Sequence, residues 1–273
     1  MCLAIIALNV LPDWPLIIVV NRDELHSRPT LPAGPWSDDP RILAGRDLSA
    51  GGTWLGMSDS GRIALLTNYR EPGKQRIDAP SRGQLPEHYL RGDARAEDYA
   101  HELALKGGSY NGFNLILGDQ TGLWYYSNRG HVNPQQIHPG VIGVSNALIN
   151  VPWPKLKRTQ RAVAEHLSQT QQPDSQRLFE ILQDTTPALP HELPDTGIGV
   201  EREKLLSSPF INDTRYGTRC TTLIMKHRDG DTLYHEKRYA QLGQPDGESI
   251  WKIDTLQNKI VLIDHDSFNT ASI

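Results

Sequence analysis

The second residue, Cys2, is the side chain in this sequence best placed to do chemistry, because an apolar run at residues 3–8 follows it directly. If Met1 is removed, Cys2 carries both a thiol and a free α-amine. An α-amine titrates at about pH 7.7–8, so it can accept the thiol proton and act as a general base. The alternative is that Cys2 is a small apolar residue that enters the core.

A β-hairpin would bring charged side chains next to this cysteine. A second apolar run at residues 16–20 ends in Asn21-Arg22-Asp23-Glu24, and a turn-rich break at residues 9–15 separates the two runs. Centring the hairpin on Pro12 places position 2 opposite position 22, so that Cys2 lies beside Arg22 or Asp23. An arginine there lowers the thiol pKa, and a carboxylate can hold the α-ammonium or orient the arginine. The alternative is a polar strand end that turns into a loop.

Asparagine ends several of the apolar runs, at Asn21, Asn68 and Asn146. Amide groups fixed at strand ends can donate hydrogen bonds to a developing oxyanion. Arg219 stands at the mouth of a later strand and adds a positive charge to this set. Asparagine also ends strands through ordinary turn chemistry, so the catalytic interpretation depends on whether these strand ends meet.

The composition is that of an ordinary soluble protein, with 38% hydrophobic residues, 22% charged residues and a formal net charge of −4 over 273 residues. It favours neither a nucleic-acid partner nor disorder. The two cysteines, Cys2 and Cys220, make no disulfide framework and fit a reducing compartment. No signal peptide or transmembrane run is recognised, so we expect a cytoplasmic protein.

The order of the expected elements defines the fold class. Residues 25–50 are expected to form a long loop, and residues 184–215 are expected to form a surface excursion. Strands are expected at 51–67, 113–128, 140–146 and 219–239, and helices at 84–106, 154–169 and 175–183. Near-continuous apolar strands are buried on both faces, so sheet must pack on sheet with helices outside. This predicts a four-layer α/β/β/α sandwich with antiparallel sheets in a single domain, 1–273.

Several motifs together resemble one known family. They are Met1-Cys2-Leu3, Asn21-Arg22-Asp23-Glu24, residues 50–56, residues 67–70, residues 145–155 and Arg219-Cys220-Thr221-Thr222. The chain resembles the NRDE family, whose animal members are called transport and Golgi organisation protein two. The resemblance spans essentially the whole chain and implies an N-terminal-nucleophile hydrolase fold, similar to the cysteine branch that includes choloylglycine and penicillin V acylases.

This resemblance implies roles for individual residues. Cys2 matches the nucleophile of an amidohydrolase, and Arg22 and Asp23 match the Arg/Asp pair near it. Asn68 and Asn146 match the carboxamide positions, and Arg219 matches the far arginine. The acylases place two residues between their Arg and Asp, whereas the two are adjacent here, so Glu24 is the alternative to Asp23.

The resemblance also implies a function of a different class, intracellular haem trafficking by a haem-binding chaperone. Haem would be a transported ligand, passed on to transient acceptor proteins. It would not be covalently attached, because no Cys-x-x-Cys-His motif is present. The expected ligand-binding residues are Asn21, Arg22, Asp23, Glu24, His26 and Trp54, with no dedicated metal site. Trp36 and Trp153 are further candidates for lining the pocket, with core packing as the alternative.

A third interpretation is a lipid-binding or acyl-CoA-binding protein without chemistry. The expected ligand is therefore a small hydrophobic molecule, either haem or an acyl lipid. The basic residues Lys155, Lys157 and Arg158 would then contact an anionic headgroup, or simply form a solvated helix face.

Overall fold

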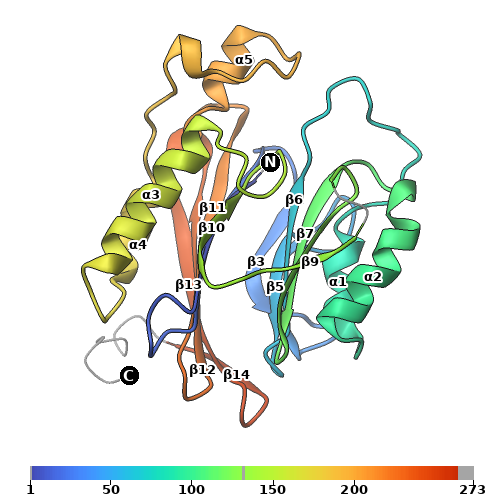
Figure 1. Ribbon diagram of the computed structural model, residues 1–273, viewed down its shortest axis with the longest axis vertical. Coiled ribbons are helices and arrows are strands. Elements are labelled where there is room, and N and C mark those ends of the chain that lie inside the picture. The colour runs from blue at the N-terminus through green and yellow to red at the C-terminus, as the bar shows by residue number, and fades with distance from the viewer. Residues whose placement is uncertain (1, 131–132, 264–273) are drawn as a thin grey trace.

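Two antiparallel sheets lie face to face in the computed structural model, which describes residues 2–130 and 133–263 (Figure 1). Sheet A has the order β10 (Gly140–Val144), β1 (Cys2–Leu8), β2 (Leu16–Leu25), β11 (Tyr216–Lys226), β12 (Asp231–Tyr239), β13 (Pro245–Asp254), β14 (Lys259–Leu262). Sheet B has the order β3 (Thr30–Pro35), β4 (Ile42–Asp47), β5 (Leu55–Ser58), β6 (Ile63–Asn68), β7 (Phe113–Asp119), β8 (Gly122–Ser127), β9 (Gln135–Gln136).

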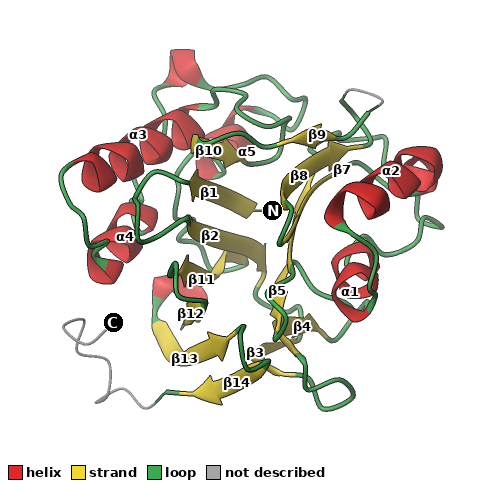
Figure 2. Ribbon diagram, turned by 60° about the horizontal axis from the view of Figure 1, so that its bottom comes forward, coloured by secondary structure: helices red, strands yellow, loops and turns green. Residues whose placement is uncertain are grey.

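Helices cover the outer face of each sheet (Figures 1 and 2). The helices α3 (Pro154–Ser168) and α4 (Ser175–Leu182) pack on sheet A, and α1 (Gln84–Arg91) and α2 (Ala96–Lys106) pack on sheet B. One apolar cluster fills the space between the sheets, and one more lies beneath each helix layer. The predicted four-layer α/β/β/α sandwich with antiparallel sheets is therefore confirmed.

Side-chain alternation along β1 and β2 sorts their residues between two layers. Ala4, Ile6, Ile18 and Val20 face sheet B, whereas their odd-numbered neighbours face the helices. The hairpin register pairs Cys2 with Arg22, as predicted. Both residues continue the face that points toward sheet B, so the thiol and the guanidinium enter the space between the sheets.

Two regions contain more regular structure than the sequence indicated. Residues 25–50 were expected to form a loop, but they contain β3 and β4, and residues 184–215 contain the short helix α5 (Val200–Leu205). Pro32 and Pro35 hide the β3 signal, since proline is accepted in a strand that lies at the edge of a sheet. The strands β13 and β14 complete the far side of sheet A and were not predicted.

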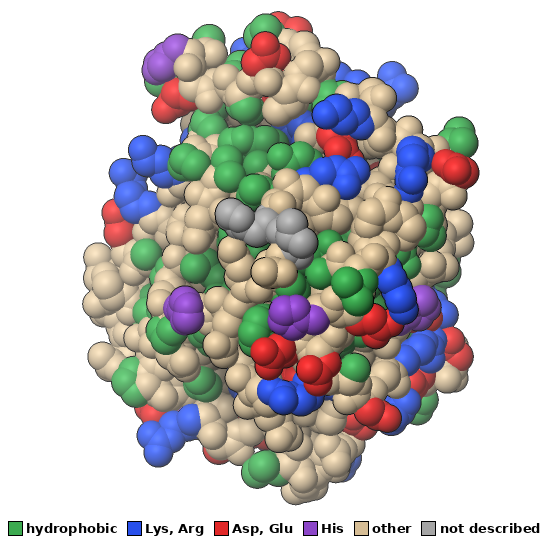
Figure 3. All heavy atoms as spheres, turned by 45° about the vertical axis from the view of Figure 1, so that its right-hand side comes forward, with side chains coloured by type: hydrophobic (Ala, Val, Ile, Leu, Met, Phe, Trp, Pro, Cys, Tyr) green, Lys and Arg blue, Asp and Glu red, His purple; other side chains and the backbone are tan. Residues whose placement is uncertain are grey.

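Acidic and basic side chains are interspersed on the face shown in Figure 3, so that neither kind of charge forms a continuous patch there. Among the described residues, no helix is both long and apolar enough to cross a membrane.

A pair of glycines fixes the loop between β4 and β5 against the start of α1. Gly51 and Gly52 both have positive φ, at 68° and 72°. The carbonyl of Gly83 accepts a hydrogen bond from the Thr53 amide at 3.1 Å, so the two chain segments touch through their backbones. A Cβ on Gly52 would overlap the Gly83 carbonyl, whereas a Cβ on Gly51 would meet nothing within 4 Å.

Comparing alanine variants of these two glycines separates the cost of a left-handed backbone from the cost of a steric overlap with Gly83. We expect Gly51→Ala to lower the free energy of unfolding by about 1–2 kcal/mol, the cost of a left-handed backbone for alanine. Gly52→Ala carries the same cost and adds about 1–3 kcal/mol for overpacking. Urea unfolding of both variants measures the difference, and equal losses would contradict the close approach to Gly83.

Candidate functional site: a cleft around Cys2

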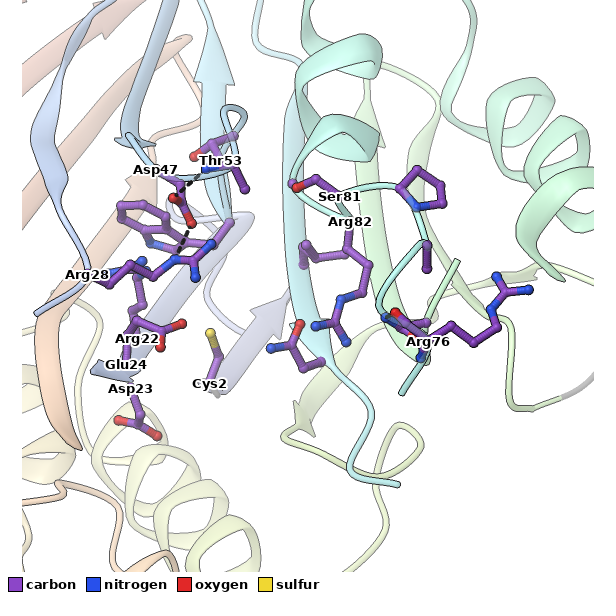
Figure 4. Close-up of a pocket in the computed structure, with 18 of the residues that line it drawn as sticks. Cys2, Arg22, Asp23, Glu24, Arg28, Asp47, Thr53, Arg76, Ser81 and Arg82 are labelled. Carbon is purple, nitrogen blue, oxygen red and sulfur yellow. Dashed lines mark hydrogen bonds and ion pairs between the residues drawn. The ribbon is translucent and has the colours of Figure 1, made fainter. Parts of the chain in front are cut away.

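A cavity of about 460 Å³ opens where β1 begins and where β2 and β6 end, with Cys2 in its wall (Figure 4). Cys2 starts β1, is 6% exposed and pairs with Arg22. Burial raises the pKa of the Cys2 thiol, so the sulfur is protonated at neutral pH. Any chemistry that needs the thiolate must therefore include a group that takes up this proton.

Arg22 lines the cavity with a buried guanidinium group. Its guanidinium lies 4.0 Å from the ring centroid of Trp54, in a cation–π contact, and the side chain is 5% exposed. Nη1 has no hydrogen-bond partner among residues 2–130 and 133–263. Leaving a buried charged donor unsatisfied is costly, so this nitrogen is suited to an anionic group that enters the cavity. Trp54 lines the same cavity, as the sequence suggested.

Asp23 follows Arg22 on β2 and therefore points the other way, toward α3 (Figure 4). Its carboxylate is fully buried, and Oδ1 accepts a hydrogen bond from Thr218 Oγ1 at 2.8 Å. A β-bulge between Thr218 and Cys220 turns the Thr218 hydroxyl to this side of sheet A. Burial raises the pKa of Asp23, and the Thr218 hydrogen bond opposes that rise.

Lys155 lies beneath Asp23, with Nζ 4.0 Å from Oδ2. The sequence placed Lys155 on a solvated or headgroup-binding face of its helix, and this was wrong, because the side chain is 1% exposed. Burial lowers the pKa of Lys155 to about 8, against the attraction of Asp23. Lys157 is exposed, and Arg158 forms an ion pair with Asp184 at 2.7 Å.

The segment Ser145–Asn146 joins the two sheets at the site. Ser145 Oγ donates to the Cys2 carbonyl at 3.0 Å, and the Ser145 carbonyl accepts from Thr67 Oγ1 at 2.6 Å. Asn146 Nδ2 donates to the Asn68 carbonyl at 2.9 Å. Asn68 lines the Cys2 cavity, whereas the Asn146 amide is buried in the connection between the sheets. The asparagine strand ends thus meet, and Asn68 is the one that reaches the cavity.

Three expected site residues have their side chains engaged elsewhere. Asn21 Nδ2 donates to the carbonyls of Leu182 and Pro209 on the helix side of sheet A. Arg219 Nη1 donates to the carbonyls of Leu25, His26 and Arg28, and this side chain borders a separate cavity of about 140 Å³. The His26 ring nitrogen Nε2 lies 3.1 Å from the Asp213 carbonyl oxygen. Arg219 and His26 thus shape the turn after β2, and Asn21 ties β2 to the end of α4. None of the three lines the Cys2 cavity.

The other two tryptophan candidates also lie outside the Cys2 cavity. Trp36 belongs to the apolar cluster beneath α1 and α2, and Trp153 packs under the guanidinium of Arg70 at 4.6 Å.

Further charged residues complete the cavity, and all of them except Glu24 were missed from the sequence. Glu24, the alternative carboxylate of the motif, lines the same cavity as Arg22. Arg28 pairs with Asp47 at 2.7 Å on one side (Figure 4). Arg76 and Arg82 approach from the loop before α1, and Arg82 Nη1 also donates to the Gly112 carbonyl at 2.8 Å. Their only sequence signal is a basic, proline-marked loop, which is typical of surface segments as well.

A second cavity, of about 480 Å³, adjoins the first and shares Glu24 and Asn68 with it. Its wall includes the apolar and aromatic side chains of Tyr69, Pro72, Ile198, Leu206 and Tyr216. A buried ion pair between Arg70 and Glu203, at 2.7 Å, fixes α5 against the end of β6. The cleft therefore has a cation-rich compartment beside Cys2 and a more apolar compartment beneath α5.

The Thr218–Asp23 hydrogen bond gives a pH-dependent prediction. We expect Thr218→Val to lower the free energy of unfolding by about 1–3 kcal/mol at pH 7, because a buried carboxylate oxygen and the Ile211 amide each lose a partner. The folded-state pKa of Asp23 is already raised, so its ionisation costs stability as the pH rises, and the variant enlarges that cost. The loss should shrink as the pH falls through the pKa of Asp23.

Urea unfolding at several pH values checks this, with Thr221→Val as the matched control. Thr221 is buried on the same strand and donates to the neutral Asn21 amide at 2.6 Å, so its loss should not vary over the same acid range. Parallel pH profiles for the two variants would contradict the role of Thr218.

Comparison with known proteins identifies the family. The sequence model described as Transport and Golgi organisation 2 matches residues 1–241. The human Transport and Golgi organization protein 2 homolog is 36% identical over 239 residues, which cover 81% of this chain and 86% of that protein. The mouse homolog is 34% identical over 238 residues, with the same coverage. The Drosophila melanogaster protein is 24% identical over 259 residues, which cover 86% of this chain and 89% of that protein.

Solved structures with a similar arrangement of elements include hydrolases. A conjugated bile acid hydrolase from Clostridium perfringens, in its C2A form, gives a TM-score of 0.43 at 10% identity and covers 97% of both chains. A Caenorhabditis elegans N-acylethanolamine-hydrolyzing acid amidase ortholog gives 0.42 at 12% identity and covers 82% of this chain and 92% of that one. The family resemblance rests on the sequence matches, and by these the chain belongs to the Transport and Golgi organisation 2 family.

Proposed function

We propose that the cleft binds and carries a ligand that joins an apolar body to anionic groups, with haem as the first cargo to test. The observation that carries this proposal is the unpartnered Nη1 of Arg22, a buried donor on a side chain that lines the Cys2 cavity together with three further arginines. Arginine recognises carboxylate and phosphate groups through its planar fork of donors.

The two compartments fit the two parts of such a ligand. Arg22, Arg76 and Arg82 would hold the anionic groups beside Cys2, since Arg28 is already paired with Asp47. The apolar body would extend past Glu24 and Asn68 into the neighbouring cavity, where Tyr69 and Tyr216 offer flat surfaces. An acyl lipid with a charged headgroup would meet the same two environments.

Haem has the required chemistry, a flat apolar ring with two propionates. Among the described residues, Cys2 is the soft donor in the cavity, whereas His26 is engaged with Asp213 outside it. Because burial raises the pKa of Cys2, ligation of iron by its thiolate should strengthen as the pH rises. A carrier of this kind would act in the cytoplasm and release haem to acceptor proteins.

Haem titration monitored by the Soret band tests this proposal. We expect saturable binding, and we expect Arg22→Met and Arg82→Met each to weaken it roughly tenfold or more, because a hydrogen bond to a charged group contributes about 1.5–3 kcal/mol. Arg95→Met is the control, since Arg95 lies at the start of α2 and pairs with Glu97. The absence of a spectral change at micromolar haem, or equal effects of all three variants, would remove haem as the cargo.

A second candidate function, hydrolysis of an amide bond, is favoured by the geometry of Cys2 itself. The thiol enters the cavity opposite Arg22, and the backbone nitrogen of Cys2 lies at the end of β1 that is nearest Asp23. After loss of Met1, that nitrogen would be a free α-amine. Asn68 lines the cavity from the other sheet, where its amide could stabilise an oxyanion.

The reaction follows from these positions. The Cys2 sulfur attacks the amide carbonyl while the α-amine accepts the thiol proton, and the same proton passes to the departing amine. Water then hydrolyses the thioester, with the α-amine as base, and frees the acid. The arginines of the cavity make an anionic amide the preferred class of substrate.

Intact mass of the protein from its native host comes first, followed by an assay with a panel of anionic amides. We expect a mass without Met1 and turnover that Cys2→Ala lowers by a factor on the order of 10⁴ or more, as removal of a nucleophile does. Cys220→Ala should retain turnover, because Cys220 lies two strands away from Cys2 and faces a different cavity. Retained Met1, or turnover that survives Cys2→Ala, would exclude this mechanism.

A further inference from the structure

A small cavity adjoins the Cys2 cavity, and neither proposed activity uses it. It has a volume of about 140 Å³, and Arg22 and Trp54 line both cavities. The guanidinium of Arg22 lies over the Trp54 ring, 4.0 Å from its centroid. This stacked pair therefore belongs to the wall that the two cavities share.

Strand pairing brings arginines from three neighbouring strands to the small cavity. Arg22 on β2 and Arg238 on β12 both pair with Cys220 on β11, so these three side chains form a row on the face that points toward sheet B. Arg219 precedes Cys220 at the β-bulge and has no partner on β2. All three arginines line the small cavity.

The carboxylates of the small cavity do not balance these three arginines. Glu236 is buried, and its Oε1 accepts a hydrogen bond from the Ala33 amide at 2.9 Å. The same oxygen lies 3.8 Å from Arg238 Nη1. The other carboxylate, Asp246, belongs to an exposed residue, so solvent screens its charge. Arg22 and Arg219 are therefore the arginines that lack a buried counter-ion.

Arg22 and Arg219 are like charges that lie close enough to repel each other. Nη1 of Arg22 has no hydrogen-bond partner among the described residues, and this side chain is 5% exposed. Arg219 is fixed in place, because its Nη1 donates to three backbone carbonyls in the turn after β2. Burial lowers the pKa of Arg219, and the charge of Arg22 lowers it further, against the attraction of groups that include Asp246.

We propose that the small cavity is a binding site for a small free oxyanion such as phosphate, held between Arg22 and Arg219. An anion there would relieve the repulsion between the two guanidinium groups and satisfy a buried donor. Arginine recognises phosphate and carboxylate groups through its planar fork of donors. A volume of about 140 Å³ admits an ion of this size but not the apolar body of the ligand proposed for the cleft.

This site is separate from the one proposed for the anionic groups of the cleft ligand. A guanidinium group carries five N–H donors, so Arg22 can serve an anion in each of the two cavities. Arg219 and Arg238 line the small cavity alone, whereas Arg76 and Arg82 line the Cys2 cavity alone. The two sites can therefore be tested independently.

Calorimetric titration of the full-length protein with potassium phosphate, at pH 7 and constant ionic strength, tests the site. We expect saturable binding with a dissociation constant on the order of 1 mM or lower. Arg219→Met should weaken binding roughly tenfold or more, because a charged hydrogen bond is lost. The matched control Arg215→Met, an exposed arginine just before β11, should bind as wild type does. The absence of saturable binding in wild type would overturn the proposal.

Two further variants show which cavity holds the phosphate. Leu31 lines the small cavity and is 48% exposed on the edge strand β3, so Leu31→Trp should fill the cavity, abolish binding and leave the fold intact. Arg82 lies on the opposite side of the Cys2 cavity from Arg22 (Figure 4), and Arg82→Met should keep the binding of wild type.

The melting temperature gives a second readout of the same variants. Phosphate should raise it in wild type and in Arg82→Met but not in Leu31→Trp, because a ligand stabilises only the protein that binds it. If Arg219→Met does not fold, Leu31→Trp decides. Binding that survives Leu31→Trp and is lost in Arg82→Met would place the phosphate in the Cys2 cavity. That result would overturn this proposal and leave the function proposed for the cleft standing.

Discussion

The structure of the site depends on one backbone constraint, the antiparallel pairing of β1 with β2 that sets Cys2 opposite Arg22. Because side chains alternate along a strand, this register sends Cys2, Arg22 and Glu24 toward sheet B, and Asn21 and Asp23 toward the helices. A slip of one residue would exchange the two sets and move the thiol out of the cleft. The four side chains of residues 21–24 therefore point into two different layers, and each side chain finds its partners in the layer that it faces.

The part of the site that the sequence predicts is the part built by local structure. The turn between β1 and β2 is short, so its centre at Pro12 was enough to derive the pairing of position 2 with position 22. The helices at 84–106, 154–169 and 175–183 were recognised from periodic apolar residues that pack against one sheet. The four-layer order followed from strands that are apolar on both faces, since such strands require cover on both sides.

The rest depends on contacts between residues that lie far apart in the sequence. The sequence grouped Lys155 with the basic residues of a solvated helix face. Its partner Asp23 could not be recognised, because Asp23 belongs to a strand that the helix covers from outside. Thr218 reaches Asp23 only through a bulge, which no pattern in the sequence indicates. Asn21 and Arg219 carry the same polar signal as Arg22, but strand alternation and the turn after β2 direct them elsewhere. Residue type identifies these side chains as candidates, but the contacts that each of them makes depend on the fold.

The buried groups that shape this cleft also contribute to the stability of the fold. The Cys2 carbonyl is tied through Ser145 to Thr67, so the strand that carries the thiol is also joined to the opposite sheet. Buried charges cost free energy, and pairs such as Lys155–Asp23 and Arg70–Glu203 persist because loss of one partner costs more than loss of both. The unpartnered nitrogen of Arg22 differs from these pairs, since an incoming anion can satisfy it. Ligand binding should therefore stabilise the folded protein as it fills the cleft.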